Sequence, residues 1–259
     1  MKHIMIKRAV LFVAVSIVFA YFSLLFAAEK KFKEKNSTHF IVYYKQDVET
    51  NFVDDIIKSA EDYYEEIAAN LGFQRYKFWL WDDRAMIYIF GDKDSYVQET
   101  NQPDWTGGCA DYRNKKLWTY PHAVGFFDSV LPHELGHIIF REFVGFGRNI
   151  PLWFDEGVAS YQEKTKRYAA KTMVKELIAQ GKLLSFEELN SVSSPHDLDQ
   201  AKAEAFYAQS VSIVYFLIDK FNKDRFVTLC RRLKEQKNFD SALDTTYYHF
   251  KNSSDLYKQ

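Results

Sequence analysis

The sequence predicts an α+β protein, with strands in the first half of the chain and helices in the second. Residues 38–44 (THFIVYY) and 85–90 (AMIYIF) are rich in β-branched and aromatic side chains, a composition typical of strands. Between them, residues 49–71 place apolar side chains at helical spacing, and Gly72 follows their end. From Asp128 onward the apolar pattern is helical almost to the end of the chain. Strands followed by helices favour the α+β class.

Two more short strands are expected at 106–111 and 116–120, joined by a turn at residues 113–114. We therefore expect a small mixed sheet with one long helix in a β-rich part (38–125), followed by a mainly helical part (126–259). The helices expected in the second part are 129–144, 151–163, 165–180, 202–222, 224–236 and 239–249.

The first of these helices, 129–144, has clear signals at both ends. Pro132 can occupy its first turn, where a backbone N–H is not needed, and Asp128 or Ser129 can act as the N-cap. Gly145 follows the last apolar residue, as expected of a helix terminus. Pro151 opens the next helix in the same way.

The N-terminus is a hydrophobic targeting or anchoring segment. Residues 9–28 carry no charge and form a stretch of about 30 Å as a helix, the thickness of a bilayer core. The segment is long for a signal peptide, and a cut after Ala27 or Ala28 would leave Leu25 or Phe26 where a small residue is preferred. A cleaved signal peptide and an uncleaved membrane anchor both remain open for residues 1–28. Either one delivers the rest of the chain, through a short tether at 29–37, outside the cytoplasm.

Composition excludes several classes of protein. Of 259 residues, 47% are hydrophobic and 27% are charged, so the chain is not disordered. The net charge of −1 offers no general attraction to nucleic acid. The 17% of aromatic residues is best explained by core packing. Cys109 and Cys230 could form one disulfide or remain free thiols, and the sequence leaves both open.

The sequence HELGH at 133–137 carries the strongest chemical signal. Residues four apart share one face of a helix, so His133 and His137 can offer their imidazoles to one ion. Neutral imidazole is a preferred ligand of Zn²⁺. Glu134 points beside the ion, where its carboxylate can take a proton from an activated water.

A catalytic zinc site needs a third protein ligand, and the next helix offers Glu156. The first helix can end near Val144 and the chain can return antiparallel, which presents Glu156 to both histidines. Gly157 and Ala159 are small, so we expect them to let the two helices approach closely. Asp155 and Ser160 flank Glu156 and are candidates to support the ligands.

The pattern His133-Glu134-x-x-His137, followed by Glu156 within WFDEGVASY, resembles the gluzincin metallopeptidases, and most closely the bacterial peptidase MA-like domains. The resemblance implies a thermolysin-like fold for residues 38–259, one Zn²⁺ ion held by His133, His137 and Glu156, and Glu134 as the general base. In that superfamily a Tyr or His from a later helix often stabilises the oxyanion. Tyr207 is the candidate here, although a core role explains it nearly as well.

Substrate-binding elements are less well marked. Residues 107–111 (GGCAD) could form the edge strand that pairs with substrate backbone in gluzincins, or a plain turn. They do not match the GAMEN sequence of the aminopeptidase branch, so the resemblance favours an endopeptidase. Three tryptophans could line a peptide groove or belong to the core; they are Trp105, Trp118 and Trp153. Four histidines lack a partner at ligand spacing and are expected at the surface or as caps; they are His39, His122, His196 and His249.

The function expected from these residues is an extracytoplasmic zinc metallopeptidase acting on peptides or proteins, and we expect a monomer. One alternative is a membrane-tethered scaffold that binds zinc without catalysis. Another is a zinc hydrolase of some non-peptide amide. The intact Glu134 favours an enzyme, because turnover uses this carboxylate and a structural site does not need it.

Overall fold

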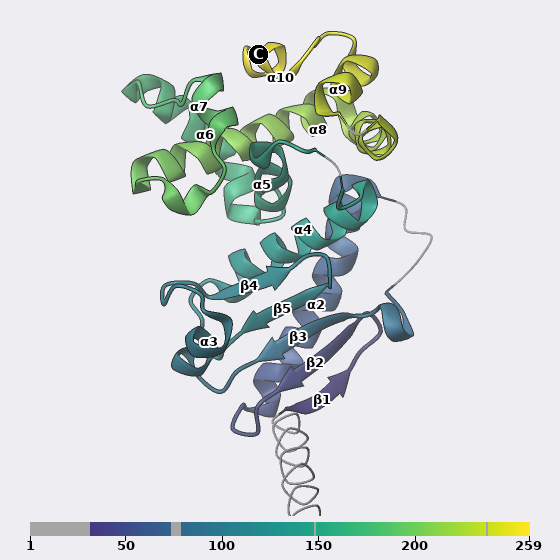
Figure 1. Ribbon diagram of the computed structural model, residues 1–259, viewed down its shortest axis with the longest axis vertical. Coiled ribbons are helices and arrows are strands. Elements are labelled where there is room, and N and C mark those ends of the chain that lie inside the picture. The colour runs from purple at the N-terminus through teal and green to yellow at the C-terminus, as the bar shows by residue number, and fades with distance from the viewer. Residues whose placement is uncertain (1–31, 74–78, 148, 237) are drawn as a thin grey trace, which may run out of the picture.

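A mixed sheet of five strands occupies one half of the molecule, and a group of helices occupies the other (Figure 1). The computed structural model describes residues 32–73, 79–147, 149–236 and 238–259. The strand order is β1-β2-β3-β5-β4; β2, β3 and β5 are parallel, and each edge strand is antiparallel to its neighbour. The strands are β1 (Lys33–Asn36), β2 (Phe40–Tyr44), β3 (Ala85–Ile89), β4 (Gly108–Asp111) and β5 (Lys116–Thr119).

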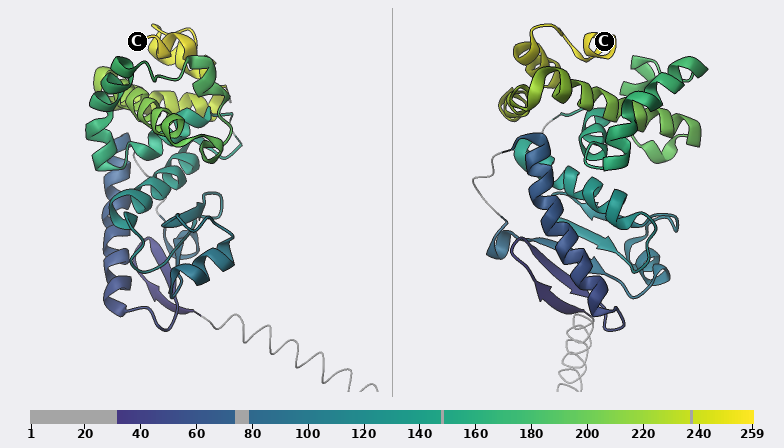
Figure 2. Two further views of the ribbon diagram at one scale, coloured as in Figure 1. Left: turned by 90° about the vertical axis from the view of Figure 1, so that its left-hand side faces the viewer. Right: turned by 180° about the vertical axis from the view of Figure 1, so that it is seen from behind.

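Two helices cover one face of this sheet, α2 (Thr50–Leu71) and α4 (Leu131–Val144). Seen from behind, both lie across the same side of the strands (Figure 2). Side chains alternate between the two faces of a strand, and Val42, Ile87 and Leu117 belong to the buried core. Because of this packing, α4 rests on a rigid layer, and whatever side chains it carries are held in place.

The second half is built around the long helix α8, against which α5, α6 and α9 pack. Its elements are α5 (Leu152–Ser160), α6 (Lys164–Gln180), α7 (Phe186–Ser191), α8 (Gln200–Gln236), α9 (Phe239–Tyr247) and α10 (Ser253–Tyr257). Helix α8 breaks at Asn222, which has φ 67° and ψ 165°. The two helices expected at 202–222 and 224–236 meet at this break.

The predicted α+β class is confirmed, with a small mixed sheet first and helices later. The short helices α3 (Lys93–Thr100), α7 and α10 were not expected from the sequence. Tyr96 is the buried side chain of α3, and Leu189 is that of α7. A helix that buries a single side chain has no apolar repeat, so periodicity does not reveal it.

The start of α4 differs from the expected one. Residues Phe126–Val130 form a π-helical turn that leads into the helix, and neither Asp128 nor Ser129 caps it. The hydroxyl of Ser129 instead donates to Glu163. The other end agrees with the prediction, because the backbone N–H of Gly145 closes the last turn.

The first residues of the domain also differ from the expected ones. Residues Lys33–Asn36, part of the expected tether at 29–37, form the edge strand β1. His39 was expected at the surface or as a cap, but it is buried. His39 directly precedes β2 and contacts α2. Its Nδ1 lies 2.5 Å from the Glu61 carboxylate, and its ring stacks on that of Tyr64 with a centroid distance of 3.9 Å.

The hydrophobic segment 9–28 lies outside the described residues. Within the described ranges, no helix combines the length and the apolar character that crossing a bilayer requires. Whether the segment is cut or retained therefore stays a prediction.

The two cysteines are free thiols. Cys109 lies half-buried on β4, whereas Cys230 is fully buried in α8. Burial raises the pKa of the Cys230 thiol well above its usual value, which keeps this group protonated.

Candidate metal centre

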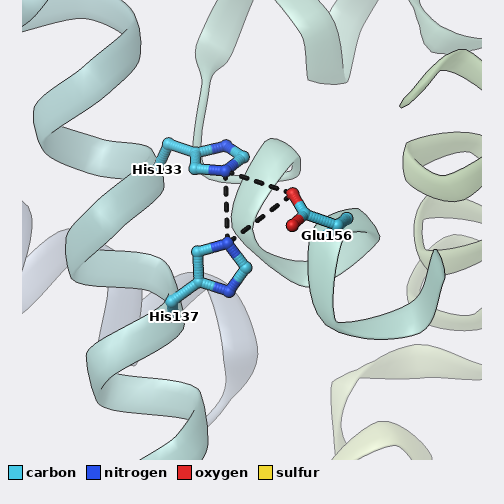
Figure 3. A group of neighbouring side chains, drawn as sticks. All are labelled: His133, His137 and Glu156. Atoms are coloured by element: carbon cyan, nitrogen blue, oxygen red, sulfur yellow. Dashed lines mark hydrogen bonds and ion pairs between the residues drawn. The ribbon is translucent and has the colours of Figure 1, made fainter. Parts of the chain in front are cut away.

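Helices α4 and α5 bring three ligand atoms together, as Figure 3 shows. His133 and His137 lie one turn apart on α4, and their Nε2 atoms are 3.2 Å apart. Glu156 on α5 turns its carboxylate toward both rings. Its Oε2 is 3.4 Å from Nε2 of His133 and 3.6 Å from Nε2 of His137. The three residues predicted from the sequence as ligands thus meet at one point.

This triangle has the dimensions of a zinc site. Ligand atoms at about 2.0–2.1 Å from a tetrahedral ion lie roughly 3.3 Å from one another. The donor set of two imidazoles and one carboxylate is that of catalytic zinc sites. In addition, Oε2 of Glu156 is buried and has no hydrogen-bond partner among the described residues. A buried carboxylate oxygen facing two imidazole nitrogens is best satisfied by a shared cation.

Small residues allow the two helices to come this close, although not the pair expected. A Cβ on Gly136 would lie 3.1 Å from Cα of Ala159, so Gly136 and Ala159 form the α4–α5 contact. The expected role of Gly157 at this contact is wrong. A Cβ at this position would lie 2.4 Å from the backbone oxygen of Ser210, so Gly157 lets α5 approach α8 instead.

A carboxylate lies behind each imidazole. Nδ1 of His133 is 2.9 Å from Oε1 of Glu163, and Nδ1 of His137 is 3.3 Å from Oδ1 of Asp155. The second pair is too poorly aligned for a hydrogen bond and is an ion-pair contact. Arg141 anchors Asp155 through two contacts of 2.7 and 2.9 Å. Such carboxylates orient ligand rings and raise their basicity.

The support expected from Ser160 is absent. Its hydroxyl is buried and has no hydrogen-bond partner in the described part of the chain. Glu163, which was not predicted, takes the supporting position beside His133. The helix expected at 151–163 offered one signal for it, because Glu163 lies two turns after Glu156.

The pKa values of the two glutamates of the centre shift in opposite directions. Burial opposes ionisation of Glu156, but the imidazoles of His133 and His137 outweigh it and lower the pKa of this carboxyl. Burial raises the pKa of Glu134. The same imidazoles oppose this increase, and the negative charge of Glu156 adds to it. Glu156 is therefore suited to binding a cation, whereas Glu134 takes up a proton more readily than an ordinary glutamate.

Two tyrosines lie near this centre. Burial raises the pKa of Tyr207 on α8, and the charges of Glu156, Glu134 and Glu163 raise it further. The hydroxyl of Tyr207 thus stays protonated and able to donate a hydrogen bond within the field of the site. Tyr112, which was not predicted, follows the end of β4 and stacks its ring on His137 at a centroid distance of 4.6 Å.

The segment 107–111 does form an edge strand, because β4 ends the sheet beside β5. Of the three candidate groove tryptophans, Trp153 belongs to the core and is 1% exposed. Trp118 stacks on Tyr88 in the sheet. Trp105 is 67% exposed, and the centroid of its ring lies 5.5 Å from that of His196. This contact joins the sheet half to the helical half.

A family model described as the peptidase MA superfamily matches residues 82–256, which include the whole candidate centre and most of the helical half. No curated protein matches the chain.

Proposed function

Because the chain belongs to the peptidase MA superfamily, we propose that it is a zinc-dependent metallopeptidase. One observation carries the proposal. Nε2 of His133, Nε2 of His137 and Oε2 of Glu156 form a triangle with edges of 3.2, 3.4 and 3.6 Å, beside the buried carboxylate of Glu134. A purely structural zinc site does not need a second acid next to its ligands.

The chain's own residues divide the work of hydrolysis. When bound, Zn²⁺ would polarise the scissile carbonyl and lower the pKa of a water. Glu134 accepts the proton of the attacking water and passes it to the leaving amine. Its Oε2 has no close protein partner among the described residues, so it is free to accept that proton. Tyr207 donates its hydroxyl hydrogen to the developing oxyanion.

The edge strand β4 supports an extended peptide as the substrate. Its outer backbone groups have no strand beside them within the described sheet, so a substrate can add as another strand. Gly108 keeps this strand close to its surroundings, since a Cβ there would lie 2.9 Å from Val130 at the start of α4. An edge strand that pairs with the backbone of an extended peptide suits an endopeptidase acting on unfolded segments.

The proposed place of action is outside the cytoplasm. Residues 9–28 are long and apolar enough to target the chain to a membrane or across it. Secretion with an anchor retained would place the centre at the membrane surface, and removal of the segment would release it.

The decisive experiment compares the purified protein with its Glu134→Gln variant. The wild type should contain one zinc per chain and digest unfolded casein, and it should lose this activity when a chelator removes the metal. Glu134→Gln should keep the zinc and lose at least about a hundredfold in rate. Glu176→Gln, an exposed change on α6, is the matched control and should leave the rate unchanged. Zinc binding without any digestion by the wild type would identify the alternative, a catalytically silent scaffold.

A further inference from the structure

Tyr112 connects the edge strand to the candidate centre. It directly follows β4, in the turn that leads into β5. This turn is fixed, because the Asp111 carboxylate accepts both the backbone N–H of Asn114 at 3.2 Å and its side-chain amide at 2.7 Å. The backbone of Tyr112 is therefore held by the same strand that we propose to bind substrate.

The ring of Tyr112 covers one face of a metal ligand. It stacks on the His137 imidazole with an angle of 25° between the planes. His137 itself is 1% exposed. A flat ring packed on the imidazole restricts its rotation, while Asp155 faces its Nδ1 from the edge. Together these contacts keep Nε2 of His137 aimed at the centre.

We propose that Tyr112 is a positioning residue that fixes the His137 imidazole through its ring. This ring function concerns metal binding and is independent of the proposed peptidase activity.

Two variants test this function. Tyr112→Leu removes the ring and should weaken zinc binding about tenfold in chelator competition, and should change the visible spectrum of the Co²⁺-substituted protein. Tyr112→Phe keeps the ring, so its zinc affinity should stay within about twofold of the wild type. Tyr168→Phe, at a position 74% exposed, is the control and should match the wild type throughout. Unchanged zinc affinity in Tyr112→Leu would overturn the ring function.

Discussion

Glu163 accepts a hydrogen bond from Nδ1 of His133 at 2.9 Å, although 30 positions separate them in the chain. The same carboxylate also accepts from Lys166 at 2.8 Å and from Ser129. Burial opposes the charge of Glu163, but His133 and Lys166 outweigh it and lower the pKa of this carboxyl. A charged, fully occupied Glu163 therefore fixes the orientation and the proton position of a metal-binding ring.

Replacing Glu163 should weaken the centre without touching a ligand. We expect Glu163→Gln to lower zinc affinity by about 10- to 100-fold, because an amide neither attracts nor holds the N–H of His133 as a carboxylate does. Zinc affinity is measured by competition with a chromogenic chelator. Glu176→Gln, exposed on the following helix, should keep wild-type affinity. Equal affinities for the two variants would show that the Glu163–His133 bond does not serve the metal.

Local patterns explain why the ligand positions could be predicted. The spacing of His133 and His137 fixes them on one face of a helix wherever that helix lies. Glu156 could be predicted as the third ligand because the chain returns antiparallel after a short connection and presents this residue to both histidines. Helical spacing placed Glu163 two turns after Glu156, but its contact with His133 depends on the turn between α5, which ends at Ser160, and α6, which begins at Lys164.

Tertiary contacts explain the remaining differences. The small size of Gly157 was visible in the sequence, but which helix approaches it depends on the path of α8, some 50 residues later. All four residues of β1 are polar, so its pairing with β2 is set by the neighbouring strand rather than by its own composition. Tyr112 carries no pattern of its own, and only the β4–β5 turn directs it at His137.

A methyl group at Gly157 should destabilise the protein. The new Cβ would meet the backbone oxygen of Ser210 at 2.4 Å, and backbone cannot swing aside. We expect Gly157→Ala to reduce the free energy of unfolding by about 2–3 kcal/mol in urea denaturation. Gly147→Ala is the control, since nothing lies within 4 Å of its Cβ, and it should change stability by about 0.5 kcal/mol or less. Similar losses for both variants would contradict the close α5–α8 contact.

The Arg141–Asp155 pair should be more sensitive than a surface ion pair. Asp155 is 4% exposed and receives two contacts from the guanidinium. Asp155→Asn removes the charge but leaves Arg141 half-buried beside an amide, so the metal-free protein should lose about 3 kcal/mol of unfolding free energy. Urea denaturation after metal removal measures this loss without a contribution from the metal. The double variant Arg141→Gln/Asp155→Asn should recover part of the loss; equal loss in both would show that the two side chains are not coupled.

The contact between His39 and Glu61 should make stability depend on pH in the acid range. Burial opposes the charge of Glu61, but hydrogen bonds from the backbone N–H of His39 and from the His39 ring lower the pKa of this carboxyl. A folded-state pKa below the unfolded one adds stability above the unfolded pKa of about 4.3, and this stability is lost as pH falls through the folded value.

Comparing two variants isolates that effect. At pH 7, Glu61→Gln should be less stable than the wild type by about 1–2 kcal/mol, because a hydrogen bond to a charged acceptor is lost. As the pH falls below about 4, the wild-type carboxylate becomes protonated and the gap should close. Urea denaturation at pH 7, 5 and 3.5 follows the gap. Glu65→Gln, exposed on the same helix, should keep wild-type stability at pH 7. A gap that stays constant or widens toward low pH would mean that the charge of Glu61 is not what the His39 contact stabilises.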